Sequence, residues 1–191
     1  MAMSEDPCGE LADFGTLERA RELSVLRYRR RLPHARAKVW RALNEDEHLA
    51  AWFPTTIEGE HVAGAPLRFS FRAAEAAPFA GEMHVFDPPS VMELRWGDDI
   101  LRFELRDEGP SLTLLDLVVT FPELGKAARD GAGWHVCLDR LADAVAGSGP
   151  SWDQHERWRN VHRVYVAQLG PEASALGPPE EWERAHPPAD Q

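Results

Sequence analysis

The chain has few cysteines and no long apolar run. Its two cysteines, Cys8 in a polar leader and Cys137 in an apolar helical pattern, do not suggest a disulfide scaffold, and we expect both to be reduced thiols. No stretch approaches the roughly 20 consecutive apolar residues that a membrane-spanning helix needs. The first residues are acidic where a secretory signal would be basic and then apolar. We therefore expect a cytoplasmic protein.

Basic side chains are in the minority, with 21 Lys and Arg against 32 Asp and Glu and a net charge of −11. Such a charge repels a phosphate backbone, which argues against nucleic acid as the main partner. The local exception is a run of arginines in which Arg27, Arg29 and Arg31 share one face at strand spacing. We interpret this face as the solvated outer side of a sheet rather than an anion site.

Recognisable catalytic and cofactor motifs are also lacking. Ser148 lies in the segment AGSGP rather than in a G-x-S-x-G nucleophile elbow, and Cys137 has apolar helical neighbours. Neither H-E-x-x-H nor C-x-x-C occurs, and His155 and His162 lie seven residues apart on a helix that we expect to be peripheral. No glycine-rich phosphate loop follows a strand. The sequence therefore predicts no metal, no cofactor and no catalytic set.

Strand patterns fill most of the chain between residues 14 and 121. Residues 14–32 predict a hairpin with its turn near Arg21 and Glu22. From residue 56 to residue 121 apolar residues recur with a period of two between turn-forming segments. Charged residues alternate with them, as in an antiparallel sheet with one solvated face. The inward candidates on these later strands are Leu67, Phe69, Phe71, Met83, Val85, Met92, Leu94, Trp96, Leu101, Phe103, Leu105, Leu112, Leu114 and Val118.

Helical spacing predicts the element that covers this sheet. Residues 131–147 place Trp134, Leu138, Leu141 and Val145 on one face of a long helix. Two short helices are predicted between the hairpin and Pro54. The apolar face of the sheet and the apolar face of the helix can cover each other. This predicts an α+β fold with an apolar pocket between a curved antiparallel sheet and the helix.

The domain organisation follows from these patterns. We expect a flexible leader over residues 1–13 and the folded domain over residues 14–147. Residues 148–169 predict a linker and a peripheral helix, and the proline-rich acidic residues 170–191 predict a mobile tail.

The pocket of this fold would be lined by aromatic side chains, methionines and leucines. Asp116 is the polar candidate, because it falls in phase with Leu114 and Val118, and an inward carboxylate needs a partner or a raised pKa. An ion pair with an arginine is the structural alternative, and packing in the core is the alternative for each apolar residue. His135 and Asp139 are interpreted as a surface pair. The full set of pocket candidates is Trp52, Phe53, Phe69, Phe71, Met83, Met92, Trp96, Phe103, Leu114, Asp116, Trp134, Leu138 and Leu141.

Two segments resemble a known family. They are LPHARAKVWRALNEDEHLAAWFP, with Val39-Trp40 and Trp52-Phe53, and AARDGAGWHVCLDRLADAV, with Gly133-Trp134. They resemble the START-like (SRPBCC) superfamily of birch-pollen allergen relatives and polyketide cyclases, in its bacterial branch named after the activator of heat-shock protein 90 ATPase. The resemblance implies a helix-grip fold in which seven strands, two short helices and a long closing helix surround a cavity.

Three functions remain open at this point. The first is a binding protein for a small hydrophobic or aromatic molecule, and the second is an enzyme resembling polyketide cyclases or aromatases. The third is an interaction protein that contacts a chaperone or regulatory partner through residues 152–169 and the tail. The inward apolar set without a catalytic set favours the first.

Overall fold

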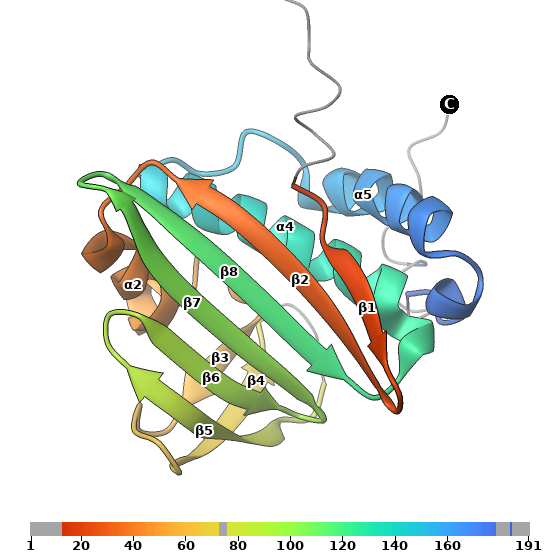
Figure 1. Cartoon of the computed structure of the whole chain (residues 1–191), viewed down its shortest axis with the longest axis horizontal. Coiled ribbons are helices and arrows are strands. Elements are labelled where there is room, and N and C mark those ends of the chain that lie inside the picture. The colour runs from red at the N-terminus through yellow and green to blue at the C-terminus, as the bar shows by residue number, and fades with distance from the viewer. Residues whose placement is uncertain (1–12, 73–75, 179–183, 185–191) are drawn as a thin grey trace, which may run out of the picture.

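The computed structural model has one antiparallel sheet that curves around a long helix (Figure 1). The structure describes residues 13–72, 76–178 and 184. The strand order is β1-β2-β8-β7-β6-β5-β4-β3. The strands are β1 (Thr16–Ala20), β2 (Leu23–Leu32), β3 (Thr55–Glu58), β4 (Pro66–Phe71), β5 (Phe79–Asp87), β6 (Val91–Trp96), β7 (Asp99–Gly109) and β8 (Leu112–Phe121). The helices are α2 (Arg36–Asn44), α3 (Asp46–Leu49), α4 (Ala127–Ala146) and α5 (Gln154–Leu169), with the 3-10 turns η1 (Leu124–Lys126) and η2 (Glu172–Ser174).

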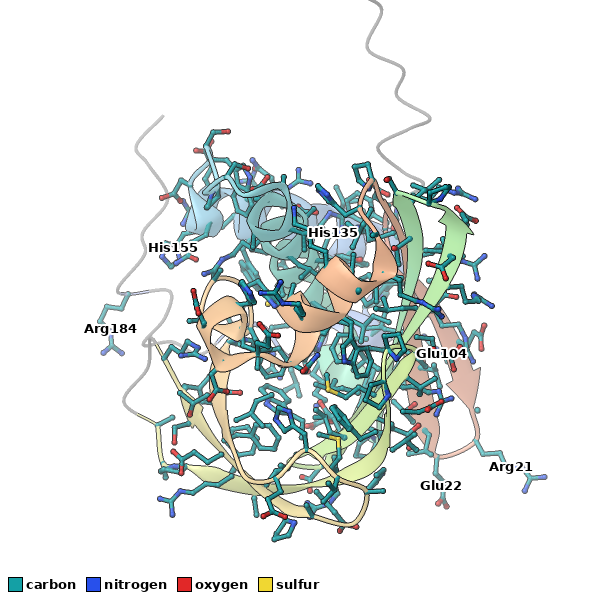
Figure 2. All side chains as sticks on the ribbon, turned by 90° about the vertical axis from the view of Figure 1, so that its left-hand side faces the viewer. Arg21, Glu22, Glu104, His135, His155 and Arg184 are labelled. Carbon is teal, nitrogen blue, oxygen red and sulfur yellow. The ribbon has the colours of Figure 1, made fainter. Side chains whose placement is uncertain are left out.

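The predicted hairpin, the two short helices and the long closing helix are confirmed. Arg21 occupies the turn between β1 and β2 with a φ of 50°, and Figure 2 shows it with Glu22 at the tip of that hairpin. The arginine face of β2 lies outside, where Arg29 pairs with Asp116 and Arg31 pairs with Glu108. The helix-grip architecture therefore follows the patterns read from the sequence.

The strand count and the phases of two strands differ from the expectation. In β5 the prediction that Val85 faces inward is wrong, because a register shift between Met83 and Val85 places Val85 opposite Glu93. The sheet has eight strands rather than seven, because the short strand β3 pairs with β4. In β8 the prediction that Leu112, Leu114 and Val118 face inward is wrong. The core side chains of this strand are Leu115, Leu117, Val119 and Phe121. Apolar residues occupy both phases of LTLLDLVV, so alternation does not define its inner face.

The long helix α4 buries the predicted stripe and extends further toward its N-terminus. It begins at Ala127, with Lys126 at the N-cap position. Trp134, Leu138 and Leu141 are buried on the stripe. Gly147 ends the helix with a φ of 80°, a left-handed conformation that glycine adopts without steric strain.

Helix α5 lies beside α4 (Figure 1) and buries Val161 and Tyr165. Part of the predicted mobile tail is docked rather than free. Ala173 of η2 is fully buried, and the Leu176 N–H donates a hydrogen bond of 2.9 Å to the Gly125 carbonyl. The predicted leader before Asp13, including Cys8, and the tail beyond Pro178 apart from Arg184 lie outside the described residues. Among the described helices, none is both long and apolar enough to cross a membrane.

Most of the space between sheet and helix is filled by side chains. Nine of the predicted pocket residues belong to this packed core. One of them is Trp134, and the other eight are Trp52, Phe53, Phe69, Met83, Met92, Phe103, Leu138 and Leu141. For these eight the alternative of core packing describes the structure.

Candidate ligand-binding site

A cavity of about 460 Å³ opens at one end of this core. Its walls come from the ends of β4 and β6, the N-terminal half of α4, and α5. The residues that line it are Pro54, Phe71, Trp96, Lys126, Arg129, Asp130, Gly133, Trp134, Cys137, Trp158 and Pro178. Three of the predicted pocket residues, Phe71, Trp96 and Trp134, are therefore among its walls.

Aromatic rings form a continuous wall of this cavity. The Trp96 ring contacts the Trp134 ring edge-on, with centroids 5.6 Å apart. Phe71 contacts Trp96 in the same manner at 5.8 Å. Phe71 is 37% exposed whereas Trp134 is 5% exposed, so the wall runs from the surface into the core. The ring of an aromatic ligand can pack against such a wall in the same edge-on or offset arrangement.

Gly133 leaves open space in the wall that α4 contributes. A Cβ built on Gly133 would meet no heavy atom within 4 Å, whereas a Cβ on Gly131 would contact Tyr165 at 3.4 Å. Glycine inside a helix destabilises it by about 1 kcal/mol relative to alanine. Neither packing nor a special backbone conformation requires glycine at position 133. Its missing side chain instead enlarges the cavity.

Charged side chains lie at the end of the cavity nearest the start of α4. Lys126 Nζ lies 2.7 Å from both carboxylate oxygens of Asp99 and 3.3 Å from Asp130 Oδ2. Arg129 Nε donates to Asp130 Oδ1 at 2.7 Å. The described charges are thus largely paired, and the remaining lining is apolar.

Burial and ion pairing limit what the titratable side chains at this cavity can do in proton transfer. Burial raises the pKa of the Cys137 thiol to about 12, so this group is neither a thiolate nor a nucleophile at neutral pH. Burial also raises the pKa of Asp99, while Lys126 opposes that shift through its hydrogen bonds and charge. Asp130 carries the one carboxylate that lines the cavity among the described residues, and both Lys126 and Arg129 neutralise it.

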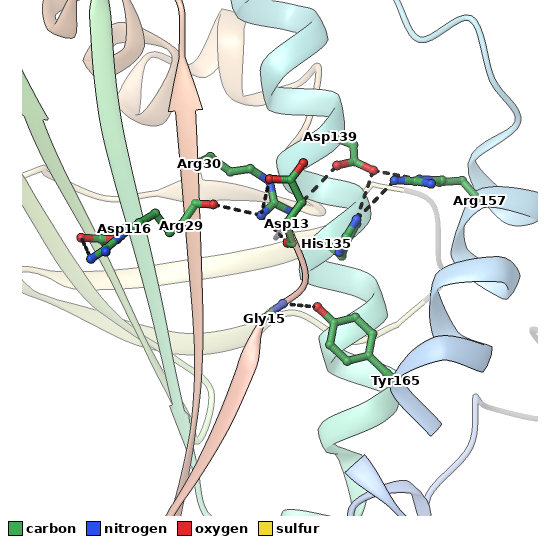
Figure 3. A network of polar contacts seen from close by, with 9 residues as sticks. All are labelled: Asp13, Gly15, Arg29, Arg30, Asp116, His135, Asp139, Arg157 and Tyr165. Atoms are coloured by element: carbon green, nitrogen blue, oxygen red, sulfur yellow. Dashed lines mark hydrogen bonds and ion pairs between the residues drawn. The ribbon is translucent and has the colours of Figure 1, made fainter. Parts of the chain in front are cut away.

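A buried polar network holds α5, and with it the cavity wall formed by Trp158, against α4 (Figure 3). Arg157 Nε donates to Asp139 Oδ2 at 2.9 Å, and Arg157 Nη2 lies 3.3 Å from His135 Nε2. An arginine nitrogen can only donate, so His135 Nε2 accepts and the neutral ring carries its proton on Nδ1. The interpretation of His135 as a surface residue is wrong, because it is 1% exposed beneath α5.

The N-terminal segment joins the same network. The Gly15 N–H donates to the Tyr165 hydroxyl at 2.7 Å, and Arg30 on β2 donates to the Asp13 carbonyl. Arg30 is 7% exposed, and its Nη2 lies 4.0 Å from Asp139 Oδ1. Segments from both ends of the domain therefore meet along α4, between strand β2 of the sheet and α5 (Figure 3).

The prediction that Asp116 faces the cavity is wrong. Asp116 lies opposite Arg29 and Glu104 in the sheet register, and Figure 2 shows Glu104 on the outer side of the sheet. Its carboxylate pairs with Arg29 at 2.7 Å and also contacts Arg106. The structural ion pair is therefore the role that the structure gives this side chain, and Leu114 lies on the same outer face.

An Asp116→Asn variant is expected to leave ligand binding unchanged and to lower the free energy of unfolding by less than about 1 kcal/mol. Both arginine partners are more than half exposed, and solvent screens such pairs. Urea unfolding and a titration with a fluorescent apolar dye would measure the two quantities. A loss of dye binding would place Asp116 in the site after all.

Several cavity residues were missed from the sequence, chiefly Lys126, Arg129, Gly133 and Trp158. The first two precede the stretch that the pattern identified as helix, and Trp158 belongs to a helix predicted to be peripheral. The one available signal was Gly133, a glycine inside a strong helical pattern, which often has a packing or functional reason.

Comparison with known proteins places the chain in a family. The sequence profile described as Activator of Hsp90 ATPase homolog 1-like protein matches residues 33–146. Similar solved structures include a conserved protein of unknown function from Enterococcus faecalis, with a TM-score of 0.69, 21% identity and coverage of 81% of this chain and 90% of that chain.

Two further structures have the same fold. CalU16 from Micromonospora echinospora has a TM-score of 0.64 and 20% identity over 81% of this chain and 96% of that one. A protein from Bordetella parapertussis has a TM-score of 0.63 and 25% identity over 82% and 92%. No curated protein sequence matches the chain. Because the family profile spans more than half of the residues and the fold agrees, the chain belongs to the Activator of Hsp90 ATPase homolog 1-like family.

Proposed function

We propose that this protein binds a small apolar or aromatic molecule in the cavity between β4, β6, α4 and α5. The observation that carries the proposal is the wall of aromatic rings from Trp96, Trp134 and Phe71, which lines the same cavity as the open space that Gly133 leaves on α4. The cavity volume of about 460 Å³ lies within the usual range of about 300–1,000 Å³ for small-molecule sites. Such sites combine apolar walls with a few polar groups, as this one does.

The other two functions receive less support from the described residues. An enzyme of the cyclase type needs a group that moves protons, and the Asp130 carboxylate and Cys137 thiol are respectively ion-paired and held protonated. An interaction surface on α5 would need several exposed apolar side chains, whereas Val161 and Tyr165 are buried and Val166 is the one large apolar residue of this helix that is exposed. Binding is therefore the function that the described residues support best.

A Gly133→Leu variant is expected to weaken binding strongly without destabilising the fold. Leucine would place its side chain in the cavity, and it replaces glycine with a residue that favours a helix by about 0.5–1 kcal/mol. The neutral dye N-phenyl-1-naphthylamine, followed by its fluorescence, serves as the probe. Its Kd should rise at least about tenfold, because a filled apolar site excludes the ring, while the Tm stays level or rises.

The control is Ala146→Leu, which adds the same side chain to an exposed position on the same helix. This variant should bind the dye as the wild type does. Unchanged dye binding in Gly133→Leu would contradict the proposal, as would a wild type that does not bind the dye. Native mass spectrometry of the purified wild type would further show whether a stoichiometric apolar passenger accompanies the protein, and Gly133→Leu should lose it.

A further inference from the structure

We infer that the ligand carries one acidic group and that Arg129 binds it, an inference that rests on the proposed cavity function. The ligand class would be a flat aromatic molecule with a carboxylate or an equivalent anionic group. Three features of one end of the cavity support this inference: the unused donors of Arg129, the position of Arg129 on α4, and the pairing of the other charges.

Arg129 has free donors at the cavity wall. Its Nε is used by Asp130, but among the described residues Nη1 and Nη2 have neither a hydrogen bond nor an ion pair. The two terminal amino groups therefore offer four N–H bonds in a planar fork. Carboxylates and sulfonates accept from such a fork through two oxygens at once.

The neighbouring charges leave Arg129 as the group that an acid would meet. Lys126 is 14% exposed, and its ammonium group forms ion pairs with Asp99 and Asp130. Asp99 is 5% exposed beneath Lys126, so its charge is already compensated. Asp130 uses one oxygen on Arg129 and the other on Lys126. The two cations therefore balance the two carboxylates, and the Nη donors of Arg129 are the hydrogen-bond donors of this cluster that the four charges leave unused.

The position of Arg129 near the N-terminus of α4 also favours an anion at this end of the cavity. Arg129 is the third residue of α4, a helix of 20 residues. The N-terminus of a helix carries a partial positive charge, so arginine there is less favourable than an acidic residue would be. An anion bound by Arg129 at this end would interact favourably with both the guanidinium and the helix dipole. The ring of the same molecule would then lie against Trp134 and Trp96, which line the cavity with Arg129.

Two dyes with the same ring system test this inference. N-phenyl-1-naphthylamine is neutral, and 8-anilino-1-naphthalenesulfonate is the same molecule with a sulfonate added. Arg129→Gln should raise the Kd of the sulfonate about fivefold, the size expected for a charged hydrogen bond that solvent partly screens, and leave the neutral dye within about twofold. Arg129→Lys should retain part of the preference, because it keeps the charge and loses the fork.

The control is Arg41→Gln, which removes the same charge from α2, where Arg41 is paired with Glu45 at the surface. It should leave both dyes unchanged. Equal effects of Arg129→Gln on the two dyes, or none on either, would overturn the assignment of Arg129 and leave the cavity function standing. Retention of both dyes by Gly133→Leu, or no binding of either dye by the wild type, would overturn the cavity function and this inference with it.

Discussion

Replacing Tyr165 with alanine is expected to lower the free energy of unfolding by about 3–5 kcal/mol, the usual cost of deleting a buried aromatic side chain. Tyr165 is fully buried between α5 and α4, where its ring contacts Phe14 with centroids 5.1 Å apart. Its hydroxyl accepts the hydrogen bond from the Gly15 N–H. The variant would leave that buried donor without a partner and a void beneath α5. Urea unfolding followed by tryptophan fluorescence would measure the loss.

Two controls separate the ring from the hydroxyl and from α5 in general. Tyr165→Phe keeps the ring and removes the acceptor, so we expect a loss of about 1–2 kcal/mol. Val166→Ala changes a neighbour that is 38% exposed and should cost less than about 0.5 kcal/mol. A Tyr165→Ala protein as stable as the wild type would show that α5 is a peripheral helix, as the sequence first suggested.

The fold could be predicted where apolar and charged residues alternate without ambiguity. Strand β7 shows this, because Leu101, Phe103 and Leu105 are buried while Arg102 and Glu104 lie between them on the other face. Helix α4 has equally regular spacing. In β8, by contrast, apolar residues occupy both faces, and Asp116, the only charged residue of the strand, was assigned to the inner face. A rule that the lone charge faces solvent would have given the correct phase.

The candidate site was harder to predict, because its residues meet only through tertiary packing. Trp96 and Trp134 were expected at a pocket because each lies in a regular apolar pattern. Arg129 and Trp158 have no such pattern, and their approach depends on how α5 packs beside α4. Local periodicity reports which face of an element is buried, but it does not report which two elements leave a gap between them.

His135 is the buried group whose titration should make stability depend on pH. Its pKa is lowered from 6.5 to about 3, first by burial and then by the positive charges of Arg30 and Arg157. Below pH 6.5 the unfolded chain takes up a proton at this histidine that the folded protein does not take up until about pH 3. Stability is thus fully present above pH 6.5 and falls with pH, by about 3 kcal/mol between pH 7 and pH 4 for this group alone.

Asp139, the acidic partner of this network, contributes with the opposite sign. Burial raises its pKa against the opposing effect of Arg157, so the folded protein binds a proton there more readily than the unfolded chain. That contribution increases stability as the pH falls toward the unfolded value of Asp139. The total profile of the wild type therefore sums both groups, and a variant that lacks only the histidine is needed to isolate its part.

His135→Phe provides that variant, because it keeps a ring against Phe14 and Tyr165 and cannot ionise. Urea unfolding between pH 4 and pH 7.5 should show a flatter stability profile for this variant than for the wild type. His84→Gln is the matched control, since His84 lies 3.5 Å from Glu93 and is 29% exposed, and it should keep the wild-type slope. An equal slope in His135→Phe and the wild type would mean that protonating the buried ring costs little. In that case Asp139, 3.6 Å from Nε2, would be the group that compensates the imidazolium.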